Sequence, residues 1–152
     1  MSNENTHIAE QLRLAYEGEA WHGPALRGLL VGVNAKQAAA KPMQNVHSIW
    51  EIVLHITTWQ SVVRKRLAGE AVEPTEEEDW KSVIDSGESA WKKTIMLLEQ
   101  SLNELLNAVL QFDESRLEQT VPGKDYSNRF MIFGVLQHNL YHTGQIALLK
   151  KL

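Results

Sequence analysis

Apolar residues recur at alternating steps of four and three through residues 86–112, where the sequence predicts its longest helix. This spacing places them on one face of the helix. Such an amphipathic helix gains most of its stability by packing that face against other elements. No segment shows the period-two alternation typical of a strand, so the partners should be further helices. The apolar positions are Trp91, Ile95, Leu98, Leu102, Leu105 and Val109.

The amino-terminal part of the sequence predicts a helix that is broken. Residues 6–17 have the helical spacing of apolar residues, and this pattern stops at Gly18. Pro24 would damage a helix interior but fits the first turn of a new helix. We therefore expect a second, shorter segment over about 24–34, followed by a connector over 35–47.

Capping residues mark the beginning of two further helices. Ser48 and Glu51 have the spacing of a capping box, in which each side chain accepts a hydrogen bond from the backbone of the other residue. The helix that they open should run to about Ala68, because Gly69 then ends it. Ser127 can cap a last helix that continues to the end of the sequence.

The connectors between these helices are long, and the one over residues 69–85 carries an acidic run, Glu76–Asp79. Runs of like charge are usually solvated. We therefore interpret this run as a loop or the start of a short helix, and not as a metal site. Thr75 and Glu78 have capping-box spacing, which favours the start of a helix.

Together these patterns predict an all-α fold, namely a four-helix bundle with long connectors and a broken first helix. The 152 residues are about one domain long and can bury a substantial core. The sequence has no internal repeat and no low-complexity tract that would divide it. We therefore expect a single domain over residues 1–152.

Composition narrows the classes of function. The net charge is −4 and the lysines and arginines are scattered, which argues against a nucleic-acid partner. No apolar run approaches the roughly 18 residues of a membrane span, and the polar start of the chain does not look like a secretory signal. We therefore expect a cytoplasmic protein without a membrane partner. The absence of cysteine excludes disulfides, cysteine nucleophiles and sulfur-ligated zinc.

Two histidines fall on the predicted inward line of the last helix. This line follows the same alternating steps of four and three that bundle cores use. His138 and His142 are four residues apart, so about 5–6 Å separates their Cβ atoms on one helix face. At that spacing two imidazoles can converge on one ion. The full line is Met131, Val135, His138, His142, Gln145, Leu149 and Leu152.

A third histidine, His55, lies on an inward line of the helix that begins at Ser48, between Ile52 and Trp59. A buried imidazole without a partner costs about 1–3 kcal/mol. A shared metal ion would satisfy all three imidazoles at once. The alternative is that each histidine is a core residue with its own hydrogen-bond partner, and spacing alone leaves both interpretations open.

Several segments resemble the DinB/YfiT-like family of four-helix-bundle metalloenzymes. The most similar are HSIWEIVLHITTW (47–59) and FGVLQHNLYHTGQIALLKK (133–151), and YEGEAWHGPAL (16–26) and VPGKDYSNRF (121–130) also match. The resemblance covers nearly the whole chain. It implies that His55, His138 and His142 are the three metal ligands of one open site. By the same analogy we expect a homodimer.

Three neutral imidazoles leave at least one coordination position open, as in catalytic zinc sites. Imidazole suits zinc, nickel, copper and iron alike, so the ligand type does not select the metal. We expect zinc or nickel first, and iron or manganese next. Family members of known activity use a low-molecular-weight thiol as co-substrate. The resemblance therefore implies a metal-dependent thiol transferase that acts on a small molecule. The alternatives are a metal-dependent hydrolase and a non-catalytic metal-binding or interaction bundle.

Other residues near the predicted site have candidate roles. Glu51 could act as a base or orient a ligand, although the capping box also explains it. Gln145 could hydrogen-bond a metal-bound ligand, and Trp59 could line the co-substrate pocket. His22 stands in the WHGP segment and is expected near the pocket mouth. An Arg or Lys in the pocket would favour a thiol transferase, whereas a hydrolase needs a carboxylate such as Glu51 near the metal.

Overall fold

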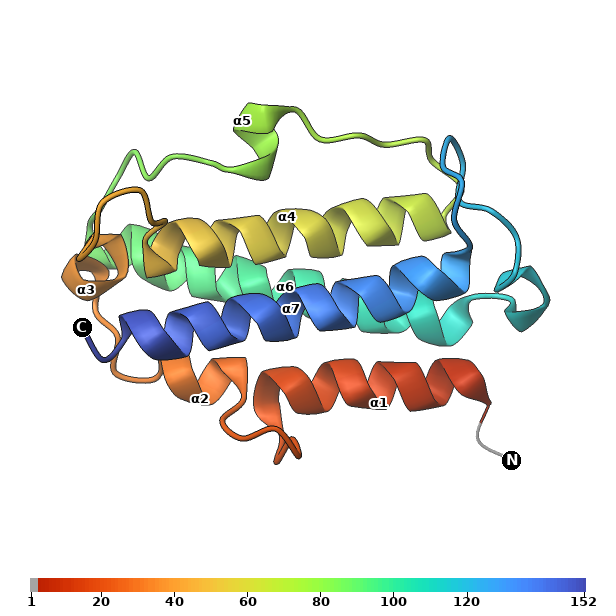
Figure 1. The fold of residues 1–152 in the computed structure, drawn as a ribbon, viewed down its shortest axis with the longest axis horizontal. Helices are drawn as coiled ribbons and strands as arrows, with labels where there is room; N and C mark the ends of the chain where they lie inside the picture. The colour runs from red at the N-terminus through yellow and green to blue at the C-terminus, as the bar shows by residue number, and fades with distance from the viewer. Residues whose placement is uncertain (1–2) are drawn as a thin grey trace.

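Four long helices lie side by side along the length of the molecule in a computed structural model, which describes residues 3–152 (Figure 1). They are α1 (Glu4–Glu17), α4 (Ile49–Leu67), α6 (Glu88–Gln111) and α7 (Asn128–Leu149). The described residues form no strand beyond two isolated bridges, which confirms the predicted all-α four-helix bundle. The short helices are α2 (Leu26–Leu30), α3 (Ala35–Ala39), α5 (Glu76–Asp79) and the 3-10 helix η1 (Glu114–Arg116).

The helices surround one apolar interior. Helix α4 packs against both α6 and α7, and α1 packs against the same two helices, so α1 and α4 lie diagonally across the bundle. Each long helix contributes an apolar face to this interior. The most deeply buried apolar side chains are Ile8, Leu12, Val53, Ile56, Leu98, Leu105, Val109, Ile132 and Ile146.

The connection between α4 and α6 runs the length of the bundle. Both helices point in the same direction, so the chain leaving the end of α4 must return to its start before α6 can begin (Figure 1). The 19 residues of α4 make that distance about 28 Å at 1.5 Å per residue. The returning segment carries α5 along the side of α4 that faces away from α1. We call residues 68–87 the crossover.

Helix α4 begins and ends as its sequence predicts. The Ser48 hydroxyl accepts a hydrogen bond from the Glu51 N–H, and the Glu51 carboxylate accepts one from the Ser48 N–H at 2.8 Å. At the other end Gly69 adopts a φ of +96°, a conformation that glycine reaches without strain. The chain can therefore turn sharply into the crossover.

Two segments differ from the prediction. The connector over 35–47 contains α3, because Asn34 and Gln37 form a capping box ahead of an alanine-rich stretch. The segment predicted over 24–34 is helical only in α2, and Gly32 follows it with a φ of +79°. The break between α1 and α2 is confirmed, and α5 starts at the predicted Thr75–Glu78 capping box.

No helix within residues 3–152 combines the length and the apolar character needed to cross a lipid bilayer.

Candidate metal centre

His55 of α4 and His138 and His142 of α7 meet where the two helices face each other. One ring nitrogen of each lies within 4.8 Å of the others, a grouping that is compatible with holding a metal ion. His55 and His142 are each 5% exposed, and His138 is partly exposed. The three side chains that the sequence singles out therefore come together in space.

The ring orientation of His55 is fixed by Asp79 at the end of α5. The Nδ1 of His55 lies 2.9 Å from the backbone oxygen of Asp79 and 2.9 Å from its Oδ1. Both oxygens can only accept, so Nδ1 must carry the hydrogen. The Nε2 of His55 then presents a lone pair to the other two histidines, as a metal-ligating imidazole requires.

Gln145 has the same effect on His142. The Nδ1 of His142 donates to the Oε1 of Gln145 at 2.6 Å, one turn along α7. This bond assigns the hydrogen to Nδ1 and leaves Nε2 bare. Gln145 thus lies beside the clustered histidines, and it contacts the outer nitrogen of His142 rather than the space between the imidazoles.

His138 differs from the other two histidines. Its Nε2 lies 2.9 Å from the Nε2 of His55. Its Nδ1 is buried without a hydrogen-bond partner in residues 3–152. Burial lowers the pKa of His138 to about 4, and the neighbouring His142 and His55 add to the effect. Burial also lowers the pKa of His142, so both imidazoles are neutral near pH 7, the form that binds metal.

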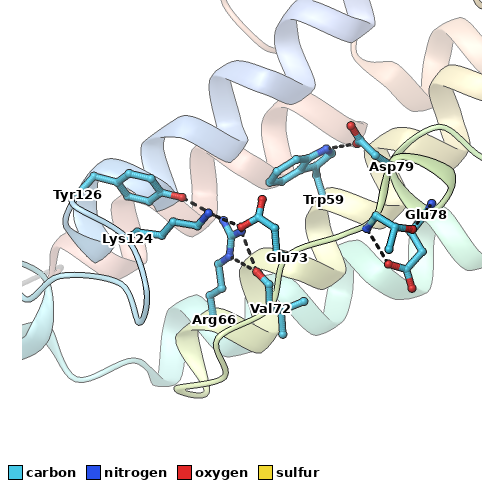
Figure 2. A network of polar contacts seen from close by, with 9 residues as sticks. Trp59, Arg66, Val72, Glu73, Glu78, Asp79, Lys124 and Tyr126 are labelled. Atoms are coloured by element: carbon cyan, nitrogen blue, oxygen red, sulfur yellow. Dashed lines mark hydrogen bonds and ion pairs between the residues drawn. The ribbon is translucent and has the colours of Figure 1, made fainter.

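Two aromatic residues enclose His55. Trp59, one turn further along α4, donates from its Nε1 to the Oδ1 of Asp79 at 2.6 Å (Figure 2). Trp80 stacks on the His55 ring with ring centroids 3.8 Å apart. The Trp80 ring also stacks on the His47 ring, with centroids 3.6 Å apart. The crossover is therefore held against α4 by hydrogen bonds and by ring stacking.

Asp79 and Trp80 were not predicted from the sequence as neighbours of His55. The acidic run does form a short helix, but Asp79 is only 28% exposed and contacts His55, so the run is not simply solvated. One feature of the sequence did indicate that this segment packs against the bundle. Trp80 directly follows the acidic run, and a large apolar ring rarely remains in water. Asp79 is not part of the three-histidine cluster; it contacts the outer nitrogen of one of its members, His55.

The buried face of α7 is rotated slightly from the predicted line. Ile132, Asn139 and Ile146 are buried, whereas His138 and Gln145 are only partly buried. The predicted line uses a repeat of 3.5 residues per turn, but a straight helix has 3.6, so a strict line drifts across the face. His138 and Gln145 therefore lie at the edge of the core.

Glu51 and His22 are not part of the three-histidine cluster. The Glu51 carboxylate binds the Ser48 N–H and forms an ion pair with Lys41 at 2.9 Å. Burial opposes ionisation of Glu51, but Lys41 and Ser48 outweigh it and lower its pKa. His22 is exposed in the loop between α1 and α2, which Figure 1 places on the opposite side of the bundle from α5.

A cavity of about 250 Å³ opens beside His138, between α4 and α7. Trp59 forms part of its wall, next to the metal-compatible cluster. A small molecule in this cavity would reach the three-histidine cluster at His138, which belongs to α7. The remaining lining residues are Val63, Arg66, Tyr126, Phe130, Met131, Gly134 and Val135.

A comparison with protein families matches the model of the DinB superfamily to residues 20–146. The chain belongs to the DinB superfamily. The match includes all three clustered histidines and confirms the resemblance seen in the sequence. No curated protein and no solved structure matches the chain. Membership of the DinB superfamily and the three-histidine cluster together fit a metal-binding protein.

We expect the metal-free protein to lose stability as the pH falls from about 6.5 to about 4. His138 titrates at about 4 in the folded protein, compared with 6.5 for an ordinary histidine. Between these values the unfolded chain binds more protons, so the free energy of unfolding decreases as the pH falls. Urea unfolding of chelator-treated protein at several pH values measures this dependence.

His138→Leu should make the dependence shallower, because this side chain can no longer take up a proton on unfolding. His7→Leu makes the same change at an exposed position of α1 and is the control. Equal slopes for the wild type and His138→Leu would contradict the prediction.

Proposed function

We propose that the protein is a metal-dependent transferase that uses a low-molecular-weight thiol as co-substrate. His55, His138 and His142 would hold one divalent ion. The observation that carries the proposal is the orientation of the imidazoles. Asp79 and Gln145 hold the outer nitrogens of two of them, so that their inner nitrogens converge with a lone pair available.

The donor set consists of imidazole nitrogens alone, which zinc, nickel, copper and iron all accept, so the ligand type does not select the metal. Zinc or nickel is our first expectation, and iron or manganese the next. Three protein ligands leave a position for another group, as in catalytic zinc sites. The bound ion would supply the positive charge that favours the thiolate form of a thiol. Because the chain has no cysteine, that sulfur would come from a co-substrate.

The surroundings of the site favour the transferase over the alternatives. Arg66 lines the adjoining cavity, which supports a charged co-substrate or substrate. A hydrolase would need a carboxylate facing the open position, but Glu51 is engaged by Ser48 and Lys41. A non-catalytic metal protein would not need a cavity beside its ligands. In this proposal Trp59 forms the pocket wall and Gln145 positions His142.

We expect tag-free, chelator-treated protein to take up one Zn²⁺ or Ni²⁺ ion per chain. Elemental analysis after dialysis measures this stoichiometry. Uptake should also stabilise the fold, by about 2.7 kcal/mol when the free ion is a hundredfold above its Kd. Thermal unfolding with and without the ion measures this second effect.

His142→Ala should abolish both effects, because the two remaining imidazoles form an incomplete site. His7→Ala removes an exposed histidine outside the cluster and should behave as the wild type. A wild-type protein that takes up neither ion would refute the metal site.

The reaction class leads to a second prediction. Metal-loaded protein, offered an epoxide or an activated aryl halide with several small thiols, should consume electrophile and thiol together. Consumption should be lost in His142→Ala and after chelation. Loss of free thiol, followed over time and corrected for the uncatalysed reaction, gives the rate. Turnover of the electrophile without any thiol would contradict the transferase and favour the hydrolase.

We also propose that two copies of the chain pair through the outer face of α7. Phe133, Tyr141 and Leu148 recur on this face and are 40%, 67% and 61% exposed. Arg129 is the one charged residue of α7 by sequence, and a helix with so few charges is usually covered. No other helix lies in front of α7 in Figure 1. Family resemblance supports the same expectation.

Light scattering after size-exclusion chromatography should give the mass of a dimer. Leu148→Lys should shift the protein towards the monomer, because it places charge on the apolar contact. Leu110→Lys introduces the same charge at an exposed apolar residue of α6, and should leave the dimer intact. A wild-type monomer at micromolar concentration would contradict the proposed pairing.

A further inference from the structure

The cavity beside His138 is elongated along the bundle. His138 and Val135 line it from α7 at one end, and Met131 lines it two turns away. The seven helical steps from Met131 to His138 span about 10 Å along the helix. Its volume of about 250 Å³ is at the small end of ligand pockets, so it fits a small molecule.

Arg66 stands at the far end of this cavity and is 2% exposed. Its Nε and Nη2 donate to the carbonyl oxygen of Val72 at 3.0 and 2.8 Å, and Nη2 also reaches Glu73 at 3.2 Å. Its Nη1 donates to the Tyr126 hydroxyl at 3.0 Å. Figure 2 shows the guanidinium between Tyr126 and the crossover. A buried charge held this firmly cannot turn away to solvent.

Two donors remain unused at this end. A guanidinium has five N–H groups, and these contacts leave one hydrogen of the Arg66 Nη1 unpaired. The Tyr126 oxygen accepts from Arg66, and its own hydrogen has no acceptor within residues 3–152. Both residues line the cavity. They would together satisfy one oxygen-bearing group of a ligand.

The charge at this end is positive. Glu73 forms ion pairs with both Arg66 and Lys124, so two cations face one carboxylate. The Lys124 ammonium is the main reason that the pKa of Glu73 is lowered, so Glu73 stays ionised. The sum of these three charges is +1, which favours an anion. A carboxylate would match both the charge and the unused donors.

The rest of the wall is apolar, apart from the histidine. Val63 comes from α4, Met131 and Val135 come from α7, and the Trp59 ring lies between Arg66 and His138. Such a wall cannot hydrogen-bond a polar chain, so burying one here would cost free energy. The body of the ligand should therefore be hydrocarbon, either aliphatic or aromatic.

We propose that this cavity binds a small apolar carboxylic acid, with its carboxylate at Arg66 and Tyr126 and its other end at the three histidines. This inference rests on the proposed function and gives the substrate class of that transferase, an acid that carries an electrophilic group such as an epoxide at the histidine end. The epoxide C–O bond would break as the thiol sulfur bonds to the carbon, and the released oxygen would take up the thiol proton. Low-molecular-weight thiols carry polar groups along their length, which the apolar wall disfavours. The thiol would therefore approach the histidines from outside this cavity.

Octanoate is the probe, and 1-octanol and glutathione are its controls. 1-Octanol has the apolar body without the carboxylate, and glutathione has carboxylates without an apolar body. Calorimetric titration of metal-loaded and chelator-treated protein measures each affinity. We expect octanoate to bind at least tenfold more tightly than either control, because a hydrogen bond to a charged group contributes at least that factor. Equal binding of octanoate and 1-octanol would overturn the assignment of the carboxylate.

Gly134→Leu tests the position of the site. Gly134 lines the cavity, and a Cβ added there meets nothing within 4 Å, so a leucine can enter the open space without a clash. Gly28→Leu is the matched control, since Gly28 is a helical glycine of α2 with equally open space outside the cavity. We expect Gly134→Leu to abolish octanoate binding and Gly28→Leu to leave it unchanged. Retained binding in Gly134→Leu would refute the site.

Arg66→Met should also abolish octanoate binding, but it removes a buried ion pair and could unfold the chain, so Gly134→Leu is the decisive variant.

Metal content, measured in parallel, separates this inference from the proposed function. Octanoate binding without metal uptake would reject the metal enzyme and keep the carboxylate site. Metal uptake without octanoate binding would reject the inference alone. Glutathione binding that Gly134→Leu blocks, without octanoate binding, would assign the cavity to the thiol and overturn the proposal.

Discussion

The hydrogen bond between the Nδ1 of His55 and Asp79 joins the bundle to its crossover. It exists because α4 and α6 are parallel, which forces residues 68–87 back along the whole of α4. The middle of that path lies beside the middle of α4, where His55 is. The direction of two helices thus determines which segment covers the imidazole and which group fixes its tautomer. A bundle with α4 and α6 antiparallel could join them with a short turn, and would have no such segment.

The crossover is held against α4 at a second point. Arg66, near the end of α4, binds Val72 and Glu73 soon after the crossover begins. Asp79 and Trp80 hold it again at His55, three turns earlier on the helix. The cavity beside His138 lies along α4 between these two points. Two of the residues that line the cavity, Trp59 and Arg66, are therefore held in place by polar contacts with the crossover.

Local interactions made most of the fold predictable. The capping boxes at Ser48 and Thr75 involve residues three apart, so they can be recognised in the sequence without knowledge of the fold. The apolar spacing of α6 likewise depends only on the period of a helix. The pairing of His138 with His142 is of this kind, whereas joining His55 to them required the family resemblance.

Contacts that depend on chain direction were not predictable in this way. Asp79 is 24 residues from His55 in sequence, and only the returning crossover brings them together. Arg66 looks in sequence like an ordinary basic residue in the last turn of a helix, where such residues are common and solvated. Its burial depends on Tyr126, which is 60 residues away. The sequence therefore predicts the clustered histidines better than the groups that orient them.

The unequal environments of the three histidines have a chemical consequence. His55 already holds its hydrogen on Nδ1, so the hydrogen between the two Nε2 atoms 2.9 Å apart must belong to His138. His138 would have to move that hydrogen to Nδ1 before its Nε2 could serve as a ligand. That Nδ1 is buried and has no acceptor in the described part of the chain. Asp79 and Gln145 already fix the tautomers of His55 and His142. The free-energy cost of organising a metal site is thus concentrated at His138, the histidine that borders the cavity.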